Sequence, residues 1–271
     1  MKAHARTLSA ELGSLVSADN FSDFLELSAF YEFMEERYWS EYEPTYTSSI
    51  AFEERIARWL GSALGSENRL SLYRSLKLLQ YISSAEMDAL CRAAFTEHII
   101  PWLCKTDGIQ LDALDYRERL QQAIGSAWFC PISDSMPIAS FCHINTLTGR
   151  NFRPDWHSLA LFGSLEMIQQ HITRHRIRKL VLLEDFVGSG NQFLRALRFA
   201  EQLDSLVEIL AVPLIVCPAG QRALTDHVAE NPRLSLTSVL ELNTEEFVLP
   251  QPGEGEAPSI SERSEERRVG K

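Results

Sequence analysis

Residues 184–192 combine two carboxylates with a glycine-containing turn, a pairing suited to binding a phosphorylated sugar. Glu184 and Asp185 follow an aliphatic run at residues 179–183, and Gly188 and Gly190 come shortly after them. A glycine turn can point backbone N–H groups at a phosphate, and the positive N-terminus of a following helix adds to the attraction. Carboxylates accept hydrogen bonds from neighbouring hydroxyls. The two features together predict a site for a ribose 5-phosphate.

The predicted phosphate loop needs no basic side chain, because its donors are backbone amides and short polar groups. Hydroxyl and amide side chains from three of its residues add further donors. The loop consists of Val187, Gly188, Ser189, Gly190, Asn191 and Gln192.

The segments around this loop predict an α/β fold with a parallel sheet. Apolar runs at 179–183 and 208–217 flank an amphipathic stretch at 191–203, which is the pattern of a strand–helix–strand unit. Ligands bind at the carboxyl ends of such strands, where the loop lies. Further strands are expected at 127–132 and 234–240, and further helices at 158–172 and 222–230.

Three regions follow from the changes in composition along the chain. Residues 1–124 predict an α-helical N-terminal region, with helices near 21–38, 50–64, 70–81 and 116–124. A further helix begins after the capping residue Ser83 and is expected to end or kink at Pro101. Residues 125–249 predict the α/β domain. Residues 250–271 are rich in Pro, Gly, Glu, Ser and Arg and predict a disordered tail. The end of this tail resembles a translated cloning junction, which would make it non-native.

The strand, acidic pair and loop resemble the phosphoribosyl-diphosphate (PRPP) signature of type I phosphoribosyltransferases. The order Glu184 then Asp185 is similar to the hypoxanthine-guanine branch. The resemblance implies a magnesium-dependent transferase that binds PRPP and releases diphosphate. It places Glu184 and Asp185 on the ribose hydroxyls as the catalytic pair and the phosphate loop on the 5-phosphate. It also implies that Mg²⁺ is carried by PRPP, without a set of protein ligands.

Ser133, Asp134 and Ser135 follow the first expected strand and are the best-placed residues for the diphosphate. A plain turn is the alternative, because these residues readily bond their own backbone. With the helical N-terminal region, this segment resembles phosphoribosyltransferase-like proteins of bacterial conflict and antiphage systems, including some retrons. That resemblance implies an effector or nucleotide sensor with a defence-system protein as partner.

Two departures from the signature leave a non-catalytic alternative open. Gly188 stands where the purine branch has an acidic residue, and Gln192 replaces the common threonine. A module that senses PRPP or a nucleotide, or one that binds a protein partner, is therefore the second hypothesis. Release of diphosphate separates a transferase from a sensor.

Other ligand-binding motifs have weaker support in the sequence than the loop at residues 184–192. A dinucleotide-binding loop would need a third glycine at Phe193, and the lysine of a P-loop is absent. His171 and His175 have zinc-ligand spacing, but with basic neighbours they predict a cationic helix end, or else an anion-attracting rim near the loop. Arg150 and Arg153 either contact diphosphate or lie in a solvated loop.

The bulk composition excludes several classes. The formal net charge of −11 argues against direct nucleic-acid binding. No apolar run approaches the length of a membrane helix, so no membrane partner and a cytoplasmic location are expected. The five cysteines contain no CxxC pair and are expected to be buried thiols.

Overall fold

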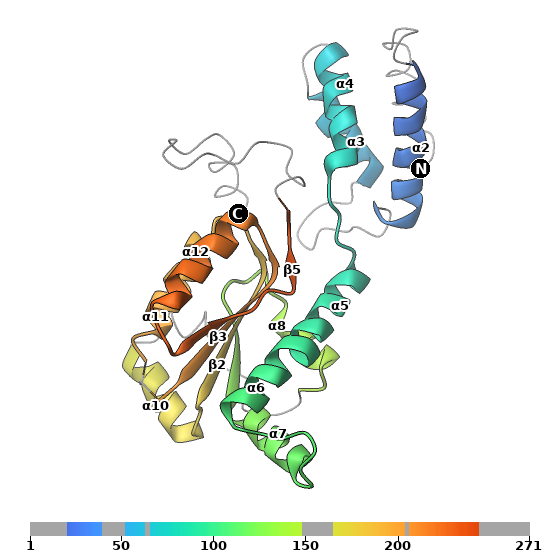
Figure 1. Cartoon of the computed structure of the whole chain (residues 1–271). Helices are drawn as coiled ribbons and strands as arrows, with labels where there is room; N and C mark the ends of the chain where they lie inside the picture. Colours follow the sequence, from blue (N-terminus) through green and yellow to red (C-terminus); the bar gives the residue numbers. More distant parts are fainter. Residues whose placement is uncertain (1–20, 40–51, 63–65, 148–164, 204–205, 244–271) are drawn as a thin grey trace. The chain divides into compact units, whose positions relative to one another are not determined.

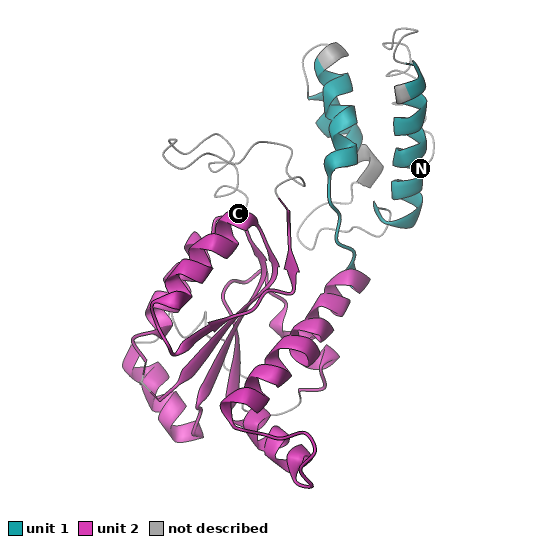
Figure 2. Ribbon diagram, in the orientation of Figure 1, with its two compact units in different colours: residues 1–84, 246–248 teal, residues 85–245, 249–271 magenta. Residues whose placement is uncertain are grey.

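The computed structural model describes residues 21–39, 52–62, 66–147, 165–203 and 206–243. The chain divides into two compact units, residues 1–84 with 246–248 and residues 85–245 with 249–271 (Figure 2). The composition changes near Gly125, whereas the division between the units follows Ser84. The difference arises because the helices between these two points pack on the sheet, through contacts such as those of α7 (Tyr116–Gly125) with the first strand.

The first unit is helical, as its amphipathic patterns predict. It contains α2 (Phe21–Arg37), α3 (Phe52–Gly61), α4 (Ser66–Ser75) and the 3-10 turn η3 (Leu76–Leu78). The helix expected over 70–81 therefore starts earlier and stops at Ser75. The buried side chains of this unit form a cluster of their own that is rich in aromatics: Phe24, Leu27, Tyr31, Trp39, Leu60, Tyr73 and Leu76.

The second unit contains a parallel sheet, which confirms the predicted fold class. Its strands run in the order β1 (Ala127–Pro131), β2 (Lys179–Val187), β3 (Glu208–Val216) and β4 (Leu234–Leu236), and β5 (Leu240–Glu241) also pairs with β3. Every pairing is parallel. β1 and β2 are buried almost throughout, as expected for a sheet covered on both faces.

Helices cover the two faces of this sheet (Figure 1). On one face, α10 (Leu165–His175), α11 (Asn191–Ala200) and α12 (Pro218–Ala229) pack against alternate strand residues such as Trp128, Leu182 and Ile209. The other face is covered by α5 (Ser84–Ala93), the π-helical segment η4 (Ala94–Ile99), α6 (Ile100–Thr106) and α8 (Ile138–Ile144). There the rings of Phe95, Phe129 and Phe141 contact one another.

Several element boundaries differ from those predicted. The strand expected over 179–183 continues to Val187, so the acidic pair lies within β2. α12 begins at Pro218 instead of Arg222, because proline is well tolerated in the first helical turn. α8 was not predicted, since it is only seven residues long. The helix expected over 158–172 is α10, and residues 158–164 lie outside the described part of the chain.

Two further expectations concern the chain as a whole. All five cysteines are free thiols, and all except the half-buried Cys104 are buried. Among the helices that the structure describes, none combines the length and the apolarity needed to cross a bilayer.

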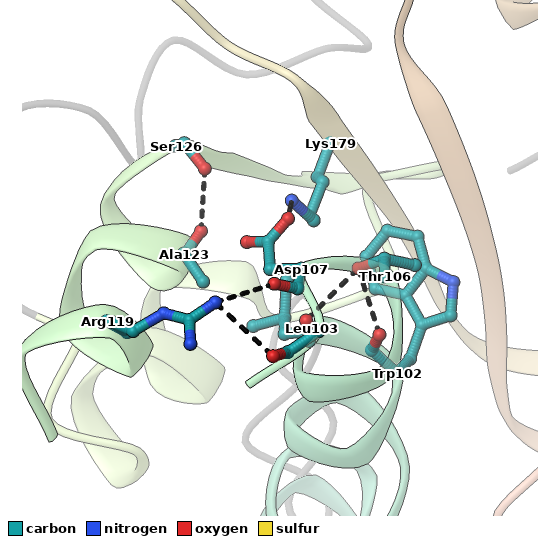
Figure 3. A network of polar contacts seen from close by, with 9 residues as sticks. Trp102, Leu103, Thr106, Asp107, Arg119, Ala123, Ser126 and Lys179 are labelled. Carbon is teal, nitrogen blue, oxygen red and sulfur yellow. Dashed lines mark hydrogen bonds and ion pairs between the residues drawn. The ribbon is translucent and has the colours of Figure 1, made fainter. Parts of the chain in front are cut away.

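An ion pair between a buried lysine and a partly exposed aspartate joins the sheet to the end of α6 (Figure 3). It lies at the edge of the sheet remote from the phosphate loop. The ammonium of Lys179, at the start of β2, lies 2.5 Å from Oδ1 of Asp107, and the Lys179 side chain is only 5% exposed. Arg119 donates to the carbonyl oxygens of Asp107 and Gly108, so the turn that carries the carboxylate is itself fixed. This network ties the first residue of β2 to the turn that follows α6.

Asp107→Ala should destabilise the second unit by about 2 kcal/mol, because it leaves the buried Lys179 ammonium without its counter-charge, while the 34% exposure of the Asp107 side chain keeps the effect below that of a fully buried pair. Lys179→Met, which removes the buried charge, should cost less. Urea unfolding measures both. Asp112→Ala, in the exposed turn that follows, is the control and should change stability by less than about 0.5 kcal/mol. Equal effects of Asp107→Ala and Asp112→Ala would contradict this account of the pair.

Candidate functional site

The candidate site lies where β1 and β2 end side by side. Pro131 pairs with Leu183, and the N–H of Ile132 donates to the carbonyl oxygen of Leu183 at 2.9 Å. Residues 132–136, here called the β1 loop, therefore leave the sheet beside Glu184 and Asp185. Parallel pairing thus brings together two segments that are about fifty residues apart in sequence.

Ser133 donates two hydrogen bonds to the first carboxylate. Its hydroxyl lies 2.6 Å from Oε1 of Glu184, and its backbone N–H lies 3.0 Å from Oε2. Ser133 is 4% exposed and Glu184 is 5% exposed. Both oxygens of Glu184 are thus engaged inside the protein.

Asp185 is more accessible than Glu184. Its Oδ1 accepts from the Ser135 hydroxyl at 3.0 Å and from the N–H of Phe186 at 2.8 Å. Asp185 is half-buried, Ser135 is exposed, and no described residue donates to Oδ2 of Asp185. The hydroxyls of Ser133 and Ser135 lie 2.7 Å apart, which links the two carboxylates through the β1 loop.

Burial raises the pKa of Glu184 to about 7. The main cause is the loss of hydration around its charged form, and the charges of Asp185 and Asp134 act in the same direction. The two hydrogen bonds from Ser133 oppose the shift because they stabilise the carboxylate. Glu184 is therefore a carboxyl group that changes its charge near neutral pH.

The phosphate loop forms the turn that the sequence predicts. Gly190 has φ = +83°, in the left-handed region that glycine adopts without strain, and it is the N-cap of α11. Its carbonyl oxygen accepts the N–H of Leu194, so the helix begins directly at the loop. Ser189, Asn191 and Gln192 are half-buried or exposed and remain accessible to a ligand.

A close contact that was not predicted from the sequence shapes this loop from behind. Gly220, in the first turn of α12, faces the loop so closely that a Cβ there would lie 2.6 Å from the Gly188 carbonyl oxygen and 2.9 Å from Cγ1 of Val187. The N–H of Cys217 also donates to the carbonyl oxygen of Val187. A glycine inside a helix is the only sequence signal for such an approach.

The histidines and arginines considered as possible ligand contacts are not part of the described site. α10 ends at His175, and its last turn carries Arg174 and His175, which confirms the cationic helix end. This end precedes β2, so it lies at the edge of the sheet opposite the phosphate loop, and the interpretation as a rim near the loop is wrong. The His171 ring packs against Trp128, and burial lowers the pKa of His171. Arg150 and Arg153 lie outside the described residues.

The described part of the chain contains no group of three or more His, Cys, Asp or Glu side chains placed to hold a metal ion. Among the residues that the structure describes, Asp185 and the exposed residues Asp134 and Ser135 offer oxygens for a ligand-borne cation at this edge. Such oxygen donors suit the coordination or water shell of Mg²⁺.

The fold and the loop agree with a comparison against protein families. The family model PRTase-CE matches residues 56–263, which is most of the chain. The chain belongs to the PRTase-CE family. It is thus a phosphoribosyltransferase-like protein, and the match extends from α3 through the sheet and the candidate site. Neither the curated proteins nor the solved structures gave a significant match.

Gly220→Ala should displace the phosphate loop and destabilise the second unit by about 1–3 kcal/mol, because the added methyl group would overlap the Gly188 carbonyl oxygen. Urea unfolding measures the change. Gly125→Ala, at the end of α7 with no atom near its added Cβ, is the matched control and should be neutral or slightly stabilising. If both substitutions are neutral, the loop does not depend on this contact.

The raised pKa of Glu184 predicts a pH-dependent stability. Between its ordinary value of 4.5 and about 7, the folded protein holds a proton that the unfolded chain has lost, so this group's contribution falls as pH rises. From about pH 6 to about pH 8 the wild type should lose about 1 kcal/mol relative to Glu184→Gln, which has no proton to release. Urea unfolding of both proteins at the two pH values measures the difference. A constant difference would show that Glu184 titrates normally.

Proposed function

We propose that this protein binds PRPP at the carboxyl edge of its sheet and transfers or hydrolyses the ribose 5-phosphate group, with release of diphosphate. The observation that carries the proposal is the juxtaposition of an accessible carboxylate, Asp185, with the phosphate loop that opens α11. Membership of a phosphoribosyltransferase-like family supports it.

Asp185 and the phosphate loop suit the two ends of the ribose 5-phosphate. Oδ2 of Asp185 can accept a hydrogen bond from a ribose hydroxyl, while residues 187–192 supply backbone and side-chain donors for the 5-phosphate. The Ser135 hydroxyl donates to Asp185, and the β1 loop also carries the exposed Asp134. The diphosphate and its magnesium would lie against these residues. Magnesium supplies positive charge that stabilises the departing diphosphate. Asp185 and residues 187–192 would hold the ribose 5-phosphate in a fixed position next to the magnesium-bound diphosphate.

A second candidate function is non-catalytic binding of PRPP or a nucleotide. Gly188 favours it, because this position in the phosphate loop offers no group that could handle a proton on an acceptor base. A role as an effector in a bacterial defence system, acting with a protein partner, is a further proposal from the resemblance. Neighbouring genes that encode other defence components would support that role.

Calorimetric titration of PRPP with Mg²⁺ into the wild type, Asp185→Asn and Asp112→Asn tests the proposal. We expect Asp185→Asn to weaken binding by about tenfold or more, or roughly 1.4 kcal/mol, because a charge-assisted hydrogen bond to the ribose is lost. Asp112→Asn, an exposed carboxylate in another loop, should bind like the wild type.

Diphosphate release from the same samples then separates the two functions. Release that depends on Asp185 supports a transferase or hydrolase, whereas binding without release supports a sensor. No PRPP binding by the wild type at about millimolar concentration, the weakest affinity that such a titration resolves, would refute the proposed site.

A further inference from the structure

The two carboxylates of the acidic pair are not equivalent in the structure. Glu184 is 5% exposed, and each of its oxygens already accepts a hydrogen bond from Ser133. Asp185, the next residue, points to the opposite side of the strand, as alternation along β2 requires. It is half-buried, and no described residue donates to its Oδ2.

A ribose hydroxyl can reach only a carboxylate that is open to the site. The Glu184 oxygens could accept further hydrogen bonds, but Glu184 is 5% exposed and Ser133, which covers it, is 4% exposed. A ribose hydroxyl could reach Glu184 only by displacing Ser133, which would leave buried polar groups without partners. Asp185 can accept a hydroxyl at Oδ2 while Ser135 and the Phe186 N–H stay in place at Oδ1. A hydrogen bond from the ligand to Asp185 therefore costs much less free energy than one to Glu184.

We infer that Glu184 is a positioning residue that holds the β1 loop through Ser133, and that Asp185 alone of the pair contacts the ribose. This inference deepens the proposed function and rests on it. Glu184 fixes Ser133, Ser133 contacts Ser135, and Ser135 reaches Asp185, so the loop that faces the diphosphate is set in position before the ligand arrives. Preorganisation of this kind lowers the entropy cost of binding.

Glutamine at position 184 can preserve this arrangement without a charge. Its amide oxygen can accept the Ser133 N–H, and its NH₂ group can donate to the Ser133 hydroxyl, whose own proton is then free to be donated to Ser135. Alanine preserves neither hydrogen bond. Glu184→Gln and Glu184→Ala therefore separate a positioning role from a direct, charge-assisted contact with the ribose.

The experiment compares PRPP affinity with Mg²⁺ for the wild type, Glu184→Gln, Glu184→Ala and Asp185→Asn. We expect Glu184→Gln to bind within about threefold of the wild type, and both Glu184→Ala and Asp185→Asn to bind at least about tenfold more weakly.

Amide hydrogen exchange of the ligand-free proteins is measured in parallel. The Ser133 amide should exchange at least about tenfold faster in Glu184→Ala than in the wild type, but not in Glu184→Gln. Amides of β1 serve as the internal reference.

The outcomes of these measurements separate a positioning role of Glu184 from a direct contact with the ribose. If the wild type binds PRPP and Glu184→Gln is as weak as Asp185→Asn, Glu184 contacts the ribose directly and the inference is overturned. Unchanged Ser133 exchange in Glu184→Ala would also overturn it, since Glu184 would not hold the loop. If the wild type binds no PRPP, the proposed function fails, and the exchange of Ser133 still decides whether Glu184 positions the β1 loop.

Discussion

The parallel pairing of β2 with β1 is the constraint on which the site depends. Because the two strands run in the same direction and Pro131 pairs with Leu183, the β1 loop and the acidic pair emerge at one edge of the sheet. β3 pairs with the other side of β2, so the start of α12 reaches the back of the phosphate loop. All three strands are buried by helices on both faces, so a one-residue shift in register would turn every side chain to the opposite face and disrupt its packing.

Buried polar side chains near its two ends help to fix the position of β2 in the sheet. The sheet can bury the Glu184 carboxyl at its end only because Ser133 supplies hydrogen bonds to both oxygens, and even so burial raises the pKa of Glu184 to about 7. At the opposite edge, the Lys179 ammonium is buried against Asp107. A partnered charged side chain near each end of β2 thus limits how the strand can shift along its neighbours.

The same arrangement explains how one loop could serve either catalysis or sensing. The phosphate loop offers backbone and amide donors but no acidic group at Gly188, so it is suited to holding a phosphate more than to moving a proton. Under the proposed function, catalysis would rest on the orientation of the ligand and on the departure of its diphosphate. The helical first unit has an aromatic core of its own.

Local pattern alone determined the parallel α/β class and the loop at 184–192, because apolar strands and a glycine turn before an amphipathic helix are short-range signals. The sequence also placed Ser133–Ser135 near the site through their position after the first strand. Only the tertiary structure decided that Glu184 is buried against Ser133 while Asp185 stays open, and that Gly220 backs the loop. Those facts depend on strand register and helix packing between segments far apart in sequence, which no local pattern encodes.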